Sequence, residues 1–324
     1  MTARIRIAIL DDSQNIAEAS ADWRSLRDRA DVVIMRDPFA NEDAVAAALA
    51  DFDIIIPMRE RTPLPGTLLN RLPKLKMIAL TGARSPSLDL AACAARGIHV
   101  SNTTGDESLT ATAELAFALI LACARDLGRA DANMHGDKWH DNLRMGIPLG
   151  GKRIGIVGLG KLGSRVAGYA RAFGMDVVAW SQNLTAKTAT AAGAKLVSKA
   201  ELFATADVVS VHLVLSPRSR NIIGAAEIEA LKPGAILVNT SRGPLVDRAA
   251  LLARLGRGDI VAGLDVYDQE PLPKTDPLRA LPNVVLTPHL GYSSDAVYRQ
   301  FYGQSVENIL SFLDGKPIRE LKAG

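Results

Sequence analysis

Short apolar segments alternate with helical patterns along the chain, in two successive series. In the first series, apolar runs predict strands at residues 5–10, 32–35, 54–57, 77–80 and 98–100, with helices at 44–50 and 88–96. In the second series, the predicted strands are 154–157, 177–180, 208–212, 236–239, 260–265 and 284–286. Strands that alternate with helices indicate βαβ units, and these predict an α/β protein built on parallel sheets.

A glycine motif opens the second series. Residues 150–163 read GGKRIGIVGLGKLG, with Gly158, Gly160 and Gly163 spaced as G-x-G-x-x-G between a predicted strand and a predicted helix. In that context the first glycine permits a tight turn, the second lets a pyrophosphate approach the backbone, and the third allows close helix–strand packing. The helix N-terminus adds free N–H groups and the positive end of its dipole. The motif therefore predicts a dinucleotide-binding site.

Two long helical stretches, 109–125 and 294–313, frame the second series. Because only eleven residues follow the second stretch, we expect it to return to the first domain. A length of 324 residues suits two domains of ordinary size. We therefore expect a substrate-binding domain of residues 1–102 plus 291–324, into which a dinucleotide-binding domain of residues 103–290 is inserted, with a cleft between them.

Composition narrows the class of protein. Hydrophobic residues make up 48% and charged residues 23%, as in soluble globular proteins. A net charge of +3 is too small to indicate nucleic-acid binding. Cys93 and Cys123 lie in apolar helical patterns, which favours core positions in a reducing compartment over a disulfide or a metal site. The chain starts directly with a strand, and its longest apolar run, 115–124, is too short for a bilayer. We expect a cytoplasmic protein without metal, membrane or nucleic acid.

Three predicted strand ends carry residues suited to catalysis. Ligands bind at the carboxyl ends of strands in open α/β sheets, and there the chain places Arg242, Glu270 and His289. An arginine binds a carboxylate through two parallel hydrogen bonds. A histidine beside a carboxylate is a general acid with a raised pKa. The set suits reduction of a 2-oxo acid, in which the arginine orients the substrate, the dinucleotide delivers hydride and the imidazolium supplies the proton.

The other histidines are weaker candidates. Isolated histidines are usually structural, and His99, His135 and His140 are interpreted in that way. His212 ends a predicted strand, so it either lines the cofactor site or has a structural role.

With these motifs, the chain resembles the D-isomer-specific 2-hydroxyacid dehydrogenases, a family that includes D-3-phosphoglycerate dehydrogenase and glyoxylate/hydroxypyruvate reductase. The resemblance covers nearly the whole chain, and its motifs follow the family's order and approximate spacing: GGKRIGIVGLGKLG, ADVVSVHLVLSPRSRNIIG, LVNTSRGPLVDRAALLARL, GLDVYDQEP and LTPHLGY. It implies a Rossmann nucleotide domain inserted into a flavodoxin-like substrate domain, hinge closure, and a homodimer built largely on the inserted domain.

The resemblance also implies residue roles. Arg242 would bind the substrate carboxylate and carbonyl, and His289 would be the acid/base with Glu270 as its partner. The residues expected to bind the cofactor are Gly158, Gly160, Lys161, Leu162, Gly163, Ser181, His212, Leu213, Thr240, Ser241, Asp265 and Gly291.

Cofactor choice depends on the end of the second strand in the nucleotide domain. NAD-specific members place an Asp there to bind the ribose 2′-OH. Here the position eighteen residues past Gly163 is Ser181, and Asp176 should lie at the opposite end of the strand. The only nearby cation is Lys187. Loss of the carboxylate removes repulsion against a 2′-phosphate, so the sequence favours NADP over NAD and leaves use of both open.

The substrate side carries further arginines. Arg59 and Arg61 follow a predicted strand and would project the same way from an extended chain. Arg84 and Ser85 lie in a loop where family members have more glycines, whose amides hold the substrate carboxylate. These residues either bind a second negative charge, such as a phosphate or a distal carboxylate, or are ordinary solvated or subunit-interface groups.

The preferred function is an NAD(P)-dependent reductase of small 2-oxo acids such as glyoxylate or hydroxypyruvate, reversible toward D-2-hydroxy acids. One alternative is D-3-phosphoglycerate dehydrogenase-type activity, and another is a non-catalytic protein that senses dinucleotides. Formate oxidation on the same scaffold does not need the pair formed by His289 and Glu270, so the presence of both favours hydroxy-acid chemistry.

Overall fold

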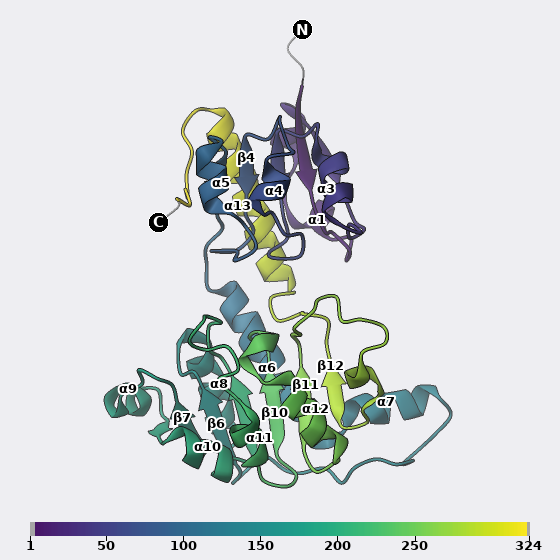
Figure 1. Ribbon diagram of the computed structural model, residues 1–324, viewed down its shortest axis with the longest axis vertical. Coiled ribbons are helices and arrows are strands. Elements are labelled where there is room, and N and C mark those ends of the chain that lie inside the picture. The colour runs from purple at the N-terminus through teal and green to yellow at the C-terminus, as the bar shows by residue number, and fades with distance from the viewer. Residues whose placement is uncertain (1–3, 323–324) are drawn as a thin grey trace. The chain divides into compact units, whose positions relative to one another are not determined.

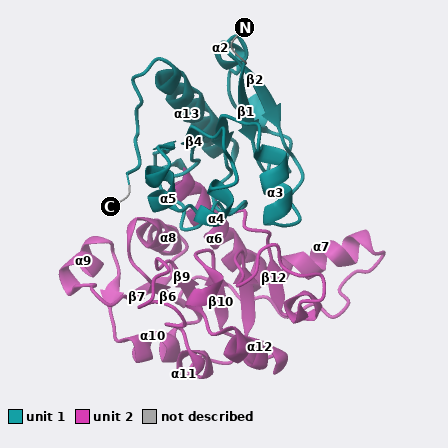
Figure 2. Cartoon of the chain, turned by 45° about the horizontal axis from the view of Figure 1, so that its top comes forward, with its two compact units in different colours: residues 1–107, 294–324 teal, residues 108–293 magenta. Residues whose placement is uncertain are grey.

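The computed structural model describes residues 4–322, and the chain divides into two compact units (Figure 2). Unit 1 comprises residues 1–107 and 294–324, and unit 2 comprises residues 108–293. Each unit contains one sheet in which every strand pair is parallel. The predicted α/β class with two parallel sheets is confirmed.

Unit 1 has a five-stranded sheet in the order β2-β1-β3-β4-β5, the order of flavodoxin-like folds (Figure 1). Its strands are β1 (Ile5–Ile9), β2 (Ala30–Ile34), β3 (Ile54–Ile56), β4 (Met77–Ala79) and β5 (His99–Ser101). Its helices are α1 (Ala17–Ser20), α2 (Arg24–Arg27), α3 (Glu42–Leu49), α4 (Gly66–Leu69), α5 (Leu90–Ala95) and α13 (Asp295–Leu313).

The apolar strands of unit 1 are buried because helices cover the sheet. All three residues of β3 and of β4 are buried, as expected for central strands of a parallel sheet. Helices α3, α4 and α5 contribute to a single apolar cluster with the sheet, whereas α13 contacts α1, α2 and β4. Asn41 and Asp89 cap α3 and α5 by accepting hydrogen bonds from the N–H groups of the first turns.

Unit 2 has a seven-stranded sheet in the order β12-β11-β10-β9-β6-β7-β8. From β8 to β11 this is the doubly wound strand order of dinucleotide-binding folds, and β12 extends the sheet by one more strand. The strands are β6 (Arg153–Val157), β7 (Asp176–Trp180), β8 (Lys195–Leu196), β9 (Val208–Val211), β10 (Ile236–Asn239), β11 (Val261–Leu264) and β12 (Val284–Leu286). The sequence predicts six strands here, and the seventh is β8, whose two residues carry no apolar pattern.

Helices cover both faces of this sheet. One apolar cluster joins the sheet to α6 (Glu107–Arg125), α8 (Lys161–Ala172) and α9 (Ala186–Ala191). A second joins it to α10 (Lys199–Thr205), α11 (Ala225–Glu229) and α12 (Arg248–Gly256). The remaining elements are α7 (Leu127–His135) and the 3-10 turns η1 (Gly243–Leu245) and η2 (Pro277–Ala280).

Helix α6 is long and apolar enough to cross a membrane by length and composition alone. Seven of its residues are buried, and they belong to the apolar cluster of unit 2. Packing in a protein core accounts for this apolar sequence. Cys123 on α6 and Cys93 on α5 are buried free thiols, in the core positions that the sequence predicts.

Candidate active site

The three predicted catalytic residues follow adjacent strands of unit 2. Strands β10, β11 and β12 are neighbours in the sheet. Arg242, Glu270 and His289 lie in the loops that leave their carboxyl ends. Because parallel strands end at one edge, the order of the strands brings these distant segments together.

His289 and Glu270 form a close pair. The His289 Nδ1 atom lies 2.5 Å from Oε2 of Glu270, and the backbone N–H of Tyr267 donates to Oε1 at 2.9 Å. Burial raises the pKa of Glu270, but the hydrogen bond to His289, the charges of His289 and Arg242, and the Tyr267 amide outweigh it and leave the pKa lowered. The carboxylate is therefore ionised at neutral pH. The ring of Tyr292 meets the imidazole edge-on, with centroids 6.1 Å apart.

Asp265 holds the loop that carries His289. Its carboxylate is fully buried and accepts from the Thr287 hydroxyl at 2.6 Å, the Leu290 N–H at 2.7 Å and the Gly291 N–H at 2.9 Å. These bonds lower the pKa of Asp265, but burial raises it by more, so the pKa is raised overall. His289 itself has φ 55°, a left-handed conformation that costs a non-glycine residue about 1–3 kcal/mol. The three bonds to Asp265 fix that conformation.

Arg242 lies in a turn built by a buried asparagine. The Asn239 side chain donates to the carbonyl of Arg242 at 2.9 Å and accepts from the Ser241 N–H at 3.0 Å. The Ser241 hydroxyl donates to the carbonyl of Val211 at 2.9 Å, which ties the turn to β9. The guanidinium of Arg242 contacts the Ser241 carbonyl at 2.6 Å, and its charge helps to lower the pKa of Glu270. Arg242 is thus within electrostatic reach of the His289–Glu270 pair.

The glycine motif has the geometry of a dinucleotide turn. Gly158 has φ 101°, and a Cβ there would lie 2.8 Å from the carbonyl carbon of His212. A Cβ on Gly163 would lie 2.2 Å from the carbonyl oxygen of Gly158. A Cβ on Gly160 would meet no atom within 4 Å. Two glycines are thus required by packing, and the third faces open space at the start of α8.

The start of α8 offers donors to a ligand. Gly160 is its N-cap and gives no side-chain hydrogen bond, so the N–H groups of the first turn, which begins with Lys161 and Leu162, are uncapped by a side chain. Such a helix start suits a phosphate.

Two buried polar atoms near this turn also suit a dinucleotide. Thr240 Oγ1 and His212 Nδ1 are buried and have no hydrogen-bond partner among residues 4–322. Burial lowers the pKa of His212 to about 3, and its Nε2 lies 2.8 Å from the Ser210 hydroxyl. His212 is therefore neutral at physiological pH. Within the same residues, no group of three or more His, Cys, Asp or Glu side chains is placed to hold a metal.

Ser181 and Asp176 lie at opposite ends of β7. Asp176 is the first residue of the strand and pairs with Arg153 at 2.7 Å. Ser181 directly follows the last residue, at the edge that carries the glycine turn. The position expected to contact the ribose 2′ group therefore carries a hydroxyl and no carboxylate.

Arg59 and Arg61 of unit 1 do not lie on an extended segment. Arg59 has φ 55°, so the segment turns directly after β3 and the two side chains do not alternate as on a strand. The Arg59 guanidinium lies over Gly82, where a Cβ would be 2.1 Å from Nη1. Arg61 donates to the carbonyl of Asp11 at 3.0 Å. The sequence predicts a common direction for the two arginines only if the chain stays extended, and the turn at Arg59 shows that it does not.

The loop after β4 is braced from within unit 1. The N–H of Gly82 donates to the Thr103 hydroxyl at 2.6 Å, and the Thr81 hydroxyl donates to the carbonyl of Pro57 at 2.7 Å. Ser85 and Ser87 share a hydrogen bond of 2.9 Å, and Arg84 is exposed. The Gly82 amide is therefore already used, and Arg84 is the exposed cation of this loop.

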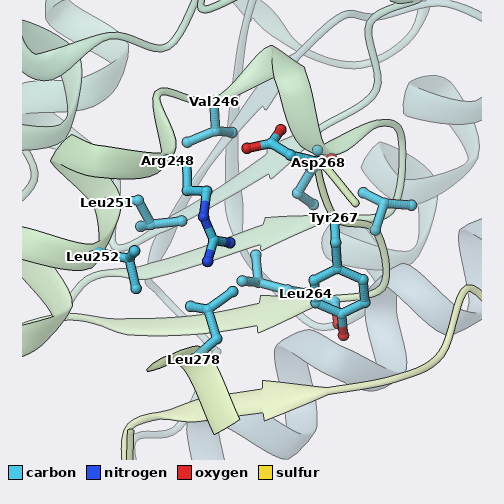
Figure 3. Close-up of a pocket in the computed structure, with 11 residues that line it drawn as sticks. Val246, Arg248, Leu251, Leu252, Leu264, Tyr267, Asp268 and Leu278 are labelled. Carbon is cyan, nitrogen blue, oxygen red and sulfur yellow. The ribbon is translucent and has the colours of Figure 1, made fainter. Parts of the chain in front are cut away.

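A cavity lies beside the catalytic turns (Figure 3). Its empty volume, which includes open solvent, is about 360 Å³, and Asn239, Gly243, Tyr267 and Asp268 contribute to its lining. Arg248 reaches into it and pairs with Asp276 at 2.7 Å. None of the three predicted catalytic residues lines this cavity.

Three residues that support the site were not singled out from the sequence. Asn239 shapes the Arg242 turn, Tyr267 binds Glu270, and Tyr292 packs against His289. Each lies within three residues of a predicted catalytic residue. For Asn239 the available signal was a polar residue at the buried end of a strand; Tyr267 and Tyr292 lie in the loops after β11 and β12 and carry no comparable signal.

Comparisons with known proteins agree with this architecture. Residues 117–291 match the family described as D-isomer specific 2-hydroxyacid dehydrogenase, NAD binding domain. The chain is 38% identical over 258 residues to a glyoxylate reductase of Aeropyrum pernix, covering 77% of this chain and 76% of that protein. It is 36% identical to a D-3-phosphoglycerate dehydrogenase of Methanocaldococcus jannaschii over 83% of this chain, but spans only 51% of that longer protein.

A solved structure extends the likeness to nearly the whole chain. The phosphoglycerate oxidoreductase of Vibrio cholerae superposes with a TM-score of 0.91 at 36% identity, and the match covers 96% of this chain and 99% of that one.

Proposed function

Because the chain belongs to the D-isomer specific 2-hydroxyacid dehydrogenase family, and is thus a nicotinamide-dependent oxidoreductase of 2-hydroxy acids, we propose that it reduces a small 2-oxo acid of the glyoxylate or hydroxypyruvate type. Arg242, Glu270 and His289 are its catalytic residues. The observation that carries this proposal is the 2.5 Å pair between His289 and Glu270, within electrostatic reach of Arg242 at one sheet edge.

Each residue has a defined task in this reaction. The Arg242 guanidinium binds the substrate carboxylate and polarises the adjacent carbonyl. His289 donates a proton to the carbonyl oxygen as it becomes a hydroxyl, and Glu270 stabilises the imidazolium before that transfer. A bound reduced nicotinamide supplies the hydride. In the reverse direction His289 accepts the hydroxyl proton.

The dinucleotide is held in unit 2 by the residues around the glycine turn. Residues 103–290 form the dinucleotide-binding domain in this proposal, and residues 1–102 with 291–324 form the substrate-binding domain. The open space at Gly160 and the partnerless atoms of Thr240 and His212 support the first assignment. Ser181, which replaces a carboxylate, favours NADPH, with NADH as a second substrate.

The substrate carries a second polar or anionic group in this proposal. Arg59 is half-buried over Gly82 and pairs with Glu60 at 3.6 Å, whereas Arg84 is exposed in the loop after β4. Both arginines lie at the carboxyl edge of the unit 1 sheet. Arg61 and Ser85 complete the predicted substrate-binding set. This feature favours a phosphorylated 2-oxo acid as the second candidate substrate, consistent with the names of two relatives.

We also propose a cytoplasmic homodimer. Two buried free thiols suit a reducing compartment. The dimer surface is the arm, which we define as residues 127–149. It is fastened by the Asp126–Arg144 pair at 2.6 Å and by a bond of 2.7 Å from Arg129 to the carbonyl of Pro282. Yet the arm exposes several large apolar side chains: Leu127, Met134, Trp139 and Met145. An ordered segment with an exposed apolar surface is typical of an interface.

Initial rates of NADPH and NADH oxidation test the proposal. The panel contains glyoxylate, hydroxypyruvate, pyruvate, 2-oxoglutarate and phosphohydroxypyruvate. We expect turnover with at least one of the first two and a preference for NADPH, which Ser181→Asp should shift toward NADH. Preference for phosphohydroxypyruvate supports the second candidate. Dinucleotide binding without turnover of any acid contradicts the proposal and favours a sensor.

A further inference from the structure

Tyr267 connects the loops that carry the catalytic residues. Its side chain is 8% exposed, and its hydroxyl lies 3.0 Å from the carbonyl of Leu264 and 2.9 Å from that of Thr287. Both carbonyls accept from the single hydroxyl hydrogen. The hydroxyl therefore links β11 to the segment that leads from β12 to His289. The backbone N–H of the same residue donates to Glu270 at 2.9 Å.

The third catalytic loop rests on the backbone of Tyr267. A Cβ on Gly243 would lie 2.3 Å from the carbonyl carbon of Tyr267 and 2.5 Å from its oxygen. The residue after Arg242 thus packs directly against Tyr267, which a side chain at that position would prevent. One residue therefore contacts the Arg242 turn, Glu270 and the approach to His289.

Tyr267 also borders the cavity beside the catalytic turns. Tyr267 and Asp268 form part of its wall, together with Val246, Arg248 and Leu251 (Figure 3). On that side of Tyr267 the cavity is partly open. The hydroxyl of Tyr267 supplies the contact that crosses from β11 to the His289 loop.

We propose that Tyr267 is a positioning residue, whose hydroxyl fixes His289 against Glu270 by holding the carbonyl of Thr287. This inference rests on the proposed function, in which the His289–Glu270 pair is the acid. Tyr267 touches no reacting atom in this arrangement. A phenylalanine would keep the ring and the backbone contacts to Glu270 and Gly243. It would remove the hydroxyl contact to the Thr287 carbonyl and leave the bonds of Thr287 to Asp265 and Leu264 in place.

The test compares Tyr267→Phe with Tyr298→Phe. Tyr298 is a matched control because its hydroxyl also donates a hydrogen bond inside the protein, to the side-chain oxygen of Gln14 in unit 1. We expect Tyr267→Phe to lower kcat about fivefold, the equivalent of one hydrogen bond of about 1 kcal/mol, with KM for the 2-oxo acid nearly unchanged. Tyr298→Phe should leave kcat unchanged.

A second readout does not depend on activity. NMR titration of ¹³C-labelled glutamate carboxyls, with Glu270→Gln to assign the signal, reports the pKa of Glu270. We expect the lowered pKa of Glu270 to rise in Tyr267→Phe, because His289 is no longer held against it, and to stay in Tyr298→Phe. An unchanged Glu270 titration overturns the inference, whether or not kcat falls. If the wild-type protein reduces no acid of the panel, the proposed function fails, and the titration alone still decides the role of Tyr267.

Discussion

At the scale of single residues, two histidines show how environment separates roles. His212 is desolvated, and burial lowers its pKa to about 3, so it carries no proton to give at neutral pH. His289 instead contacts an ionised carboxylate, and its side chain is 26% exposed, which permits proton exchange with solvent. The sequence places both histidines at strand ends and favours His289 as the acid through its motif. The burial that keeps His212 neutral depends on the packed structure and cannot be predicted from the sequence.

Replacement of His289 by alanine tests its role. Loss of a general acid should lower kcat by roughly 10²- to 10⁴-fold, while the Kd of the dinucleotide stays close to that of the wild type. His99→Gln is the control, since His99 lies in unit 1, stacked on Phe312. Steady-state rates and dinucleotide titrations measure both quantities. Normal turnover of His289→Ala would show that another group supplies the proton.

Glu270 should make stability depend on pH in the acid range. Its folded-state pKa is lowered, so its ion pair stabilises the fold above the ordinary glutamate pKa of 4.5, and this contribution is lost as pH falls through the lowered value. Melting temperatures of wild type and Glu270→Gln should therefore differ at pH 6–7 and converge at acid pH. A difference that grows as pH falls would contradict the ionised pair.

At the scale of elements, the glycines of the β6–α8 turn have different roles: Gly163 is required by packing, and Gly160 leaves space for a ligand. Gly163→Ala should destabilise the protein, because its Cβ would lie 2.2 Å from a backbone oxygen. Gly160→Ala should leave the melting temperature nearly unchanged but weaken dinucleotide binding by about tenfold or more, because the methyl group would occupy the space for the pyrophosphate.

Gly168 on the same helix is a matched control, since its Cβ would also meet no atom within 4 Å. Gly168→Ala should stabilise the helix by up to about 1 kcal/mol without changing affinity. Thermal unfolding and fluorescence titration measure the three variants. Unchanged dinucleotide affinity in Gly160→Ala would exclude the pyrophosphate from this position.

Most strands and long helices could be predicted from the sequence, because the spacing of apolar residues within each segment reflects which of its faces is buried. The strand 154–157, for example, alternates between the two apolar clusters of unit 2, with Ile156 in one and Val157 in the other. Strand β8 was missed because two residues carry no period. The turn at Arg59 was missed because a positive φ in a non-glycine residue has no pattern in sequence.

The supporting contacts of the site were not predictable in the same way. The sequence predicts Asp265 as a cofactor-binding residue, but it does not indicate that the buried carboxylate accepts from the N–H groups of Leu290 and Gly291, some 25 residues away in sequence. Tyr267 reaches Thr287 over a similar separation. Strand order decides such pairings, and no local pattern encodes them.

At the scale of the whole molecule, the exposed apolar side chains of the arm predict a homodimer. Trp139 is 66% and Met145 94% exposed, and burial of such side chains against a second copy would remove apolar surface from water. The double variant Trp139→Ser, Met145→Ser should shift the protein toward monomers in sedimentation experiments. Val214→Ser, at an 84% exposed site outside the arm, should not. A wild-type protein that sediments as a monomer at micromolar concentration would contradict the proposed dimer.

In the proposed reaction, Arg242 binds the substrate carboxylate beside the His289–Glu270 pair. The most direct test is the single-turnover rate of nicotinamide oxidation with a saturating 2-oxo acid, in wild type and Arg242→Ala, together with the Kd of the dinucleotide. Arg153→Ala, at the opposite edge of the same sheet, is the control.

This role of Arg242 predicts an unchanged dinucleotide Kd for Arg242→Ala and a rate that falls by roughly 10²-fold or more, since two charge-assisted bonds of about 1.5–3 kcal/mol each are lost. An Arg242→Ala protein that oxidises the nicotinamide at the wild-type rate would contradict it.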